Sequence, residues 1–361
     1  MGDAGLEEEK QRLRLGVVTS DDAGWKSVRK RWEDDLVGYR PILRHLEDHA
    51  RILKAITDWR GPRSVGAALE GRAAAQSALR EGVNVILLTT LQNAAFVPLP
   101  KGVLYLVYGD CTDSQLVRLY NGKEPHFPGS LIGRCVGRLA RRGCYFLCAS
   151  EWYREALRCE HAISEDRLIF LPHYVDTQLW RPLENKVPGK RKQVLFIGGD
   201  FQRKGGDILY DLAALEPFRN VDFHVVSPNA EPGPDNVHVH RSLTAECAGL
   251  IELTRNCDVL VLPTRADVSS LAALEAAACG VPAIITNRGG IPEIVIDGHS
   301  GRVLPEPLLQ PFAEALAAFL ANKDLVAAYG RNARAHVQRS YSKSRHFGIL
   351  REVIARAAGV S

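Results

Sequence analysis

Short apolar runs alternate with helical patterns along most of the chain. The runs cover residues 14–20, 83–90, 102–109 and 144–150 in the first half, and 193–199, 221–227, 257–264 and 281–286 in the second. Continuous apolar runs of this length are typical of strands buried on both faces of a sheet. Segments between them, such as 66–82 and 244–256, have the pattern of helices. The alternation predicts an α/β protein with parallel sheets.

A polar segment, residues 181–192, separates the two sets of runs. It contains two prolines, one glycine and five basic residues, which is typical of a linker between domains. We therefore predict two Rossmann-like domains facing across a cleft, residues 1–180 and 193–340. Residues 341–361 form a predicted C-terminal helix, with a return to the N-terminal domain as one option. Ligands of open α/β sheets bind at the carboxyl ends of the strands, so polar residues at those positions are candidates for a binding site.

Composition and charge narrow the class of protein. The 361 residues are 46% hydrophobic and 24% charged, as in soluble globular proteins. A net charge of +4 is too small to predict nucleic-acid binding, and no apolar run approaches the roughly 18 residues of a membrane span. The polar, acidic N-terminus does not resemble a secretory signal. We expect a cytoplasmic protein with no nucleic-acid partner.

The eight cysteines do not indicate a metal site. None belongs to a C-x-x-C pair, and no histidine cluster accompanies them. Several lie in apolar contexts, so we interpret them as small buried thiols in a reducing compartment. The sequence therefore predicts no metal and no cofactor.

The first polar strand end of the second domain is VLFIGGDFQRKGGDILYDL. A strand ends at Gly198 and Gly199, a helix begins after two further glycines, and Arg203 and Lys204 lie between. A helix N-terminus flanked by two cations favours an anion such as phosphate. A surface turn with solvated Arg and Lys explains the same residues.

The second strand end is PTRADVSSLAALEAAACGVP, which places two carboxylates beside an apolar helix. Ser269 or Ser270 is expected to cap that helix, and Glu275 then lies in its second turn. A helix that is apolar nearly all round should be buried, so an ionised Glu275 needs partners. Either a ligand or an internal ion pair satisfies this requirement. A third strand end, ITNRGGIPEIVIDGHSGRVL, is consistent with a ligand loop or with simple turns.

These three motifs, in this order, resemble the C-terminal domain of family 4 glycosyltransferases, which are retaining enzymes of the GT-B fold. The resemblance extends over residues 149–305, including the crossing segment before the linker. It implies that Arg203 and Lys204 bind the diphosphate of a nucleotide sugar, that Asp267 contacts the transferred sugar, and that Glu275 binds the ribose. The residues implied in donor binding are Gly198, Gly199, Arg203, Lys204, Asp267, Ser269, Ser270, Leu271 and Glu275. Those implied in catalysis are Arg203, Lys204 and Asp267.

Two positions depart from the family pattern. Asp267 replaces the first glutamate of the family's E-x(7)-E motif and is one methylene shorter. Gly199 stands where many relatives have an arginine, so one cation is missing from the implied phosphate site.

The first half supplies weaker candidates for binding an acceptor. Gly24 begins a helix after the first strand, Gln92 follows the second strand, and Asp110 follows the third. Asp110 is alternatively the N-cap of the next helix. Four arginines at helical spacing favour either a solvated helix face or contact with an anionic membrane surface or acceptor. They are Arg134, Arg138, Arg141 and Arg142.

The resemblance and the residues together predict a metal-independent retaining glycosyltransferase. It would move a sugar from a nucleotide-diphosphate sugar to a hydroxyl group of a glycan, lipid or small-molecule acceptor. One alternative is a nucleotide-sugar epimerase of similar fold, which would need no acceptor. Another is a degenerate protein that binds the sugar nucleotide without turnover.

Overall fold

The computed structural model describes residues 15–18, 42–44, 63–123, 131–186, 189–245 and 247–357. The chain divides into two compact units. The first comprises the described residues up to Arg118, then Lys123–Leu171 and the end of the chain from Ile349; the second comprises Leu119–Gly122 and Pro172–Gly348. The boundary at Leu171 therefore precedes the segment that we interpret as a linker.

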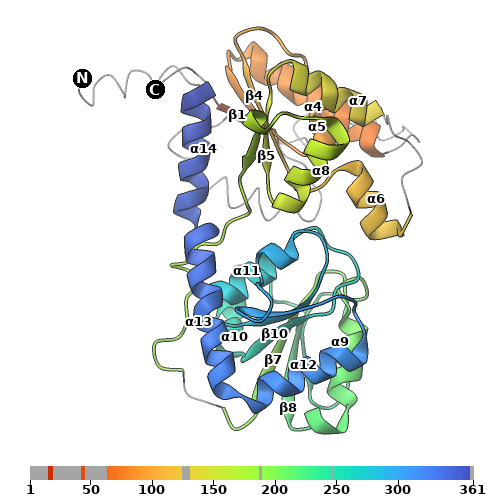
Figure 1. The fold of residues 1–361 in the computed structure, drawn as a ribbon, viewed down its shortest axis with the longest axis vertical. Helices are drawn as coiled ribbons and strands as arrows, with labels where there is room; N and C mark the ends of the chain where they lie inside the picture. The colour runs from red at the N-terminus through yellow and green to blue at the C-terminus, as the bar shows by residue number, and fades with distance from the viewer. Residues whose placement is uncertain are drawn as a thin grey trace, which may run out of the picture. The chain divides into compact units, whose positions relative to one another are not determined.

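A six-stranded parallel sheet organises the N-terminal half (Figure 1). Its strands lie in the order β2-β1-β3-β4-β5-β6. The elements are β1 Leu15–Val18, β2 Ile42–Arg44, α4 Arg63–Arg80, β3 Val85–Thr89, α5 Leu91–Ala94, β4 Leu104–Gly109, α6 Asp113–Asn121, α7 Leu131–Arg141, β5 Tyr145–Cys148, α8 Glu151–His161 and β6 Leu168–Phe170.

A second parallel sheet organises the C-terminal half, in the order β12-β11-β10-β7-β8-β9. The elements are β7 Lys192–Ile197, α9 Gly206–Ala214, β8 Val221–Val226, β9 Val237–His240, α10 Ala248–Asn256, β10 Val259–Leu262, α11 Leu271–Ala278, β11 Ala283–Thr286, β12 Gly301–Leu304, α12 Leu309–Ala321, α13 Lys323–Ser340 and α14 Lys343–Ala357. Helices α9 and α12 contact each other, and α11 contacts both α10 and α13.

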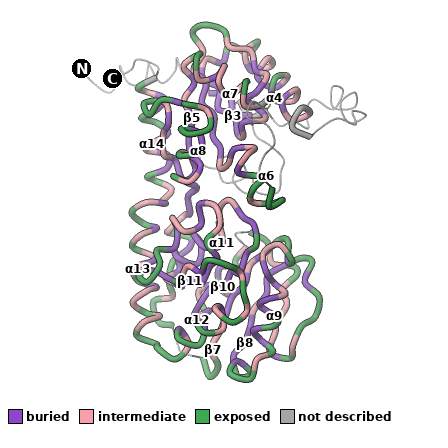
Figure 2. The backbone as a smooth tube through the Cα atoms, turned by 45° about the vertical axis from the view of Figure 1, so that its right-hand side comes forward, coloured by how far each residue is buried: buried purple, intermediate pink, exposed green. Residues whose placement is uncertain are grey.

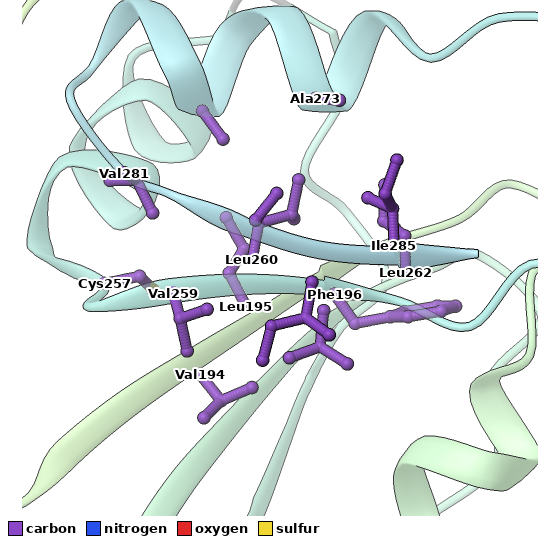
Figure 3. Close-up of a cluster of buried hydrophobic side chains, with 14 of the residues drawn as sticks. Val194, Leu195, Phe196, Cys257, Val259, Leu260, Leu262, Ala273, Val281 and Ile285 are labelled. Carbon is purple, nitrogen blue, oxygen red and sulfur yellow. The ribbon is translucent and has the colours of Figure 1, made fainter. Parts of the chain in front are cut away.

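The central strands of the second sheet form its hydrophobic core. Side chains of β7 and β10, among them Leu195, Phe196 and Leu260, are fully buried, and they point to both faces of the sheet, one of which α11 covers (Figure 3). Figure 2 shows the same distribution along the backbone, with the central strands buried and the loops exposed. The apolar runs of the sequence thus correspond to strands covered on both faces.

The prediction of an α/β protein with two parallel sheets is confirmed. The ends of the predicted strands lie within two residues of the observed ones, which is the usual uncertainty of element ends. Four observed strands, β2, β6, β9 and β12, have no counterpart among the apolar runs, and each is the edge strand of a described sheet. Within the described ranges, no helix combines the length and apolarity needed to cross a membrane.

Three histidines gather at the edge of the second sheet, on β8 and β9. The ring of His224 stacks on His238, and its Nδ1 lies 3.1 Å from Nε2 of His240. Its Nε2 contacts the side-chain oxygen of Gln193. Asp222 lies 3.4 Å from His238 and is the carboxylate of this group. Burial, and then the neighbouring His240 and His238, lowers the pKa of His224 from its usual 6.5 to about 4.

We expect this histidine cluster to make the C-terminal domain acid-sensitive. Because the pKa of His224 is lower in the folded state, the unfolded chain binds the proton more readily between pH 6.5 and 4. The free energy of unfolding therefore falls as the pH falls through that window. Between pH 7.5 and 5, the melting temperature of His224→Gln should fall by less than that of the wild type. Exposed His299 provides a control, since His299→Gln should behave as the wild type does; an unchanged pH response of His224→Gln would contradict the prediction.

Candidate functional site

Gly205 lets the loop after β7 lie directly against the loop after β10. It precedes α9 with a φ of 81°, and a Cβ atom there would lie 2.1 Å from the carbonyl oxygen of Pro263. Glycine is the residue that tolerates both the left-handed backbone and this approach. The N–H of Arg265 also donates to the carbonyl oxygen of Arg203 at 2.9 Å. These contacts place Arg203 and Lys204 beside the end of β10.

Arg203 and Lys204, in the loop after β7, both lie next to Asp267, which belongs to the loop after β10. The ammonium group of Lys204 donates to Oδ2 of Asp267, and these side chains are only 14% and 10% exposed. Nη1 of Arg203 lies 3.8 Å from Oδ1 of Asp267 and donates to the carbonyl oxygen of Ala266 at 2.6 Å. Its Nε lies 3.2 Å from Oδ2 of Asp200. The structure therefore brings the three residues with implied catalytic roles into one cluster.

The loop after β11 closes the other side of Asp267. Gly289 has a φ of 53°, and a Cβ atom there would lie 2.5 Å from the carbonyl oxygen of Asp267. The N–H of Gly290 donates to the carbonyl oxygen of Val268 at 2.8 Å. The loops after β7 and β11 thus both contact the loop that carries Asp267, the first at the Asp267 carboxylate and the second at the backbone, as expected where parallel strands share a carboxyl edge.

Helix α11 begins directly after this cluster. Oγ of Ser270 accepts a hydrogen bond from the N–H of Ala273 at 3.2 Å, so Ser270 is the N-cap. Ser269 and Leu271 are half-buried beside it. Their predicted contacts with phosphate or sugar oxygens stay predictions. Gly198 is buried behind Lys204, whereas Gly199 is exposed, with open space around the position of its absent side chain.

Glu275 is buried in the second turn of α11, as the sequence predicts. It is 4% exposed and lies on a helix whose residues from Ala273 to Ala278 are all buried. Burial, with a contribution from the Glu275 carboxylate, raises the pKa of the neighbouring Cys279 thiol to about 12. The binding of Glu275 to ribose stays a prediction.

Gln92 and Asp110 both follow strands of the first sheet, as predicted. Nε2 of Gln92, at the end of β3, donates to Oδ1 of Asp113 at 2.6 Å. Asp110 is half-buried directly after β4 and hydrogen-bonds the side chain of Cys111. The third candidate, Gly24, lies outside the described residues.

Asp110 is not the cap of α6, which corrects one of the two interpretations given above. The N–H of Gln115 donates to Oγ1 of Thr112 at 3.1 Å, and the N–H of Thr112 donates to Oε1 of Gln115 at 3.0 Å. This reciprocal pair is a capping box, and it satisfies the start of the helix without Asp110. The T-x-x-Q spacing at positions 112–115 is the signal that would have found it.

Glu160 is a polar residue of this region that sequence reasoning missed, and it lies close to Asp113. Oγ1 of Thr112 donates to Oε2 of Glu160 at 2.8 Å, and the pKa of Asp113 is raised by burial, against the opposing effects of Gln92 and His161. Glu160 and His161 end α8, far along the chain from α6. No local pattern links the two helices, so the cluster depends on tertiary contact.

The described cysteines are all free. Four of them are buried, in agreement with the sequence, but Cys159 is exposed on α8 and corrects the interpretation of all eight as buried thiols. Across the part of the chain that the structure describes, no group of three or more His, Cys, Asp or Glu side chains is placed to hold a metal ion. The metal-free site stays a prediction.

Comparison with known proteins identifies relatives of the second half most clearly. Residues 182–336 match the family described as Glycosyl transferases group 1. An uncharacterized glycosyltransferase of Methanocaldococcus jannaschii is 27% identical over 47% of this chain and 54% of its own length. The MMP alpha-(1->4)-mannosyltransferase of Mycolicibacterium hassiacum is 26% identical over 61% of this chain and 57% of its own. The chain thus spans little more than half the length of these curated relatives.

A solved structure resembles the chain over most of its length. The Anabaena protein HepE, in complex with UDP, has a TM-score of 0.68 at 15% identity and covers 96% of this chain and 92% of its own. At this identity the likeness concerns the fold. The predicted GT-B class, with two Rossmann-like α/β domains, is confirmed.

Proposed function

We propose that the chain, whose residues 182–336 match the Glycosyl transferases group 1 family, is a retaining, metal-independent glycosyltransferase that acts in the cytoplasm. It moves a sugar from a nucleotide-diphosphate sugar to a hydroxyl group of an acceptor. The observation that carries this proposal is the meeting of Arg203, Lys204 and Asp267 at two strand ends, those of β7 and β10, inside the segment that matches the family.

The donor site in this proposal is built around the leaving diphosphate. As the bond to the sugar breaks, negative charge grows on the diphosphate, and Arg203 and Lys204 stabilise that charge. Preorganised groups of this kind act most strongly on the transition state. Open space around Gly199 leaves room for phosphate oxygens near the backbone. Asp267 binds sugar hydroxyls and Glu275 binds the ribose, in line with the resemblance. The acceptor hydroxyl attacks without an enzyme nucleophile.

The acceptor is held by the polar cluster at the strand ends of the first domain. Gln92, Asp110 and Asp113 supply donors and acceptors that suit hydroxyl groups.

A panel of nucleotide sugars, scored by the shift in melting temperature, tests the donor half of the proposal. UDP-glucose, UDP-N-acetylglucosamine, GDP-mannose and ADP-glucose are suitable probes. A ligand that binds only the folded state at 100 times its Kd stabilises by about 2.7 kcal/mol. Absence of any shift would contradict the proposal. Product formed from the best donor without an acceptor would favour the epimerase, and binding without turnover on any acceptor would favour the degenerate protein.

Glu275→Gln should weaken binding of the best donor and of its bare nucleoside diphosphate alike. The change keeps the size of the side chain but removes charge-assisted hydrogen bonds to the ribose, which contribute about 1.5–3 kcal/mol each. We expect the Kd to rise about tenfold or more for both ligands, measured by titration calorimetry. Glu293→Gln, a change of the same charge on a half-buried residue after β11, serves as a control. An unchanged Kd for Glu275→Gln would remove Glu275 from the donor site.

Peripheral contact with an anionic membrane is a further part of the proposal. Arg134, Arg141 and Arg142 are exposed on and beside α7, whereas Arg138 is held by its hydrogen bonds to the carbonyl oxygens of Ala95 and Val97. Each exposed arginine near an anionic surface contributes about 1 kcal/mol. The triple change of the exposed arginines to glutamine should abolish co-sedimentation with phosphatidylserine vesicles. If the wild type fails to sediment with them, this contact is excluded.

A further inference from the structure

We propose that Asp267 makes the donor site discriminate against a bare nucleoside diphosphate and in favour of a nucleotide-diphosphate sugar. The inference rests on the proposed function and adds a selectivity that follows from the contacts that Asp267 makes in the structure. Its carboxylate is paired with Lys204, the cation that the diphosphate is to bind.

Both cations of the site are already neutralised. Lys204 is paired with Asp267, and Arg203 is shared between Asp200, Asp267 and the carbonyl oxygen of Ala266. Two positive charges therefore face two carboxylates. A diphosphate that enters must draw Lys204 away from Asp267, and it brings more negative charge beside a carboxylate that is 10% exposed.

The hydrogen-bonding chemistry of the two ligands then differs at Asp267. Carboxylate and phosphate oxygens only accept hydrogen bonds, so a bare diphosphate offers Asp267 nothing in place of the Lys204 ammonium. A poorly hydrated carboxylate that loses its partner is costly. Hydroxyl groups donate, and in a nucleotide sugar they are attached directly to the diphosphate. Such a ligand satisfies Lys204 with phosphate and Asp267 with sugar hydroxyls at the same time.

This arrangement has a consequence for turnover. After transfer the sugar leaves with the acceptor, and the remaining nucleoside diphosphate faces Asp267 without compensating donors. Asp267 would therefore assist release of the product and limit inhibition by it. Arg203 stays nearby throughout because Ala266 and Asp200 hold its guanidinium group.

Titration calorimetry of Asp267→Asn tests the inference. The probes are inorganic diphosphate, the best nucleotide sugar of the panel, and the matching nucleoside diphosphate. The amide removes the competing negative charge and can donate to phosphate. We expect inorganic diphosphate and the nucleoside diphosphate to bind about tenfold more tightly, which corresponds to about 1.4 kcal/mol. The nucleotide sugar does not share this gain. The Kd of the nucleoside diphosphate divided by the Kd of the nucleotide sugar should therefore fall at least tenfold. Unchanged or weaker binding of both diphosphates would overturn the inference.

Two further variants separate this effect from simple changes in charge or folding. Asp200→Asn removes the same charge from an exposed carboxylate, so it should alter the affinities for sugar-bearing and bare ligands alike. If Asp200→Asn lowers the ratio of Kd values for bare and sugar-bearing ligands as much as Asp267→Asn does, a general effect of charge explains the result and the inference is wrong. In Lys204→Gln/Asp267→Asn the gain for diphosphate, measured against Lys204→Gln alone, should be clearly smaller, because part of it depends on releasing Lys204. If no nucleotide sugar binds the wild type, the proposed function fails, while the inorganic diphosphate titrations still decide the role of Asp267.

Discussion

Lys204→Ala is expected to lower turnover by about 10²–10³, the scale measured for loss of one preorganised stabilising group. In the proposed reaction the ammonium group contacts the diphosphate most strongly when the leaving group is most negative. Gly199 supplies no charge, so Lys204 and Arg203 carry the positive charge of this loop. The loss should therefore appear in kcat more than in KM.

The same variant will also lose some stability, because the Lys204 side chain is mostly buried against Asp267. Arg203 stays 3.8 Å from that carboxylate, so we expect the loss to be about 1–3 kcal/mol rather than complete unfolding. Turnover and melting temperature should be measured on one preparation. Lys323→Ala, at the exposed start of α13, is the matched control and should change neither. Full activity in Lys204→Ala would exclude the residue from the site.

Gly205→Ala should destabilise the C-terminal domain by about 3 kcal/mol or more and abolish donor binding. The left-handed backbone costs a non-glycine residue about 1–2 kcal/mol, and the added Cβ would lie 2.1 Å from a backbone oxygen of Pro263, which has to move. Movement of that loop displaces Asp267 from Lys204. For a domain of this size the melting temperature should fall by about 6–12 °C.

Gly199→Ala is the matched control for this change. It adds the same methyl group six residues earlier, at an exposed position with open space around it. We expect the melting temperature of Gly199→Ala to stay within about 2 °C of the wild type. Equal destabilisation by the two changes would show that the loop tolerates no side chain in general, and that the contact between Gly205 and Pro263 is not the cause.

The central strands of both sheets were predictable because their environment demands a simple pattern. A strand covered on both faces must be apolar at every position, so β3, β4, β7 and β10 read as continuous apolar runs. The edge strands β6, β9 and β12 are covered less completely. Strand β9, with the sequence VHVH, carries two histidines, so its short alternating pattern did not stand out.

The residues of the candidate donor site could also be named from the sequence. Parallel strands end at a common edge, so polar residues after the strands, such as Lys204, Asp267 and Glu275, were expected to gather there. The sequence by itself determined the fold class and these candidates, because strand burial and strand direction follow from local patterns.

Only the tertiary structure decided which of these groups contact each other. The pairing of Lys204 with Asp267 joins residues 63 positions apart, and it depends on the close approach that Gly205 permits. The contact of Thr112 with Glu160 likewise joins two helices that no local pattern relates. Hydrogen bonds and ion pairs form over a few ångströms, so they are set by how loops pack, and side-chain spacing along the chain does not encode that packing.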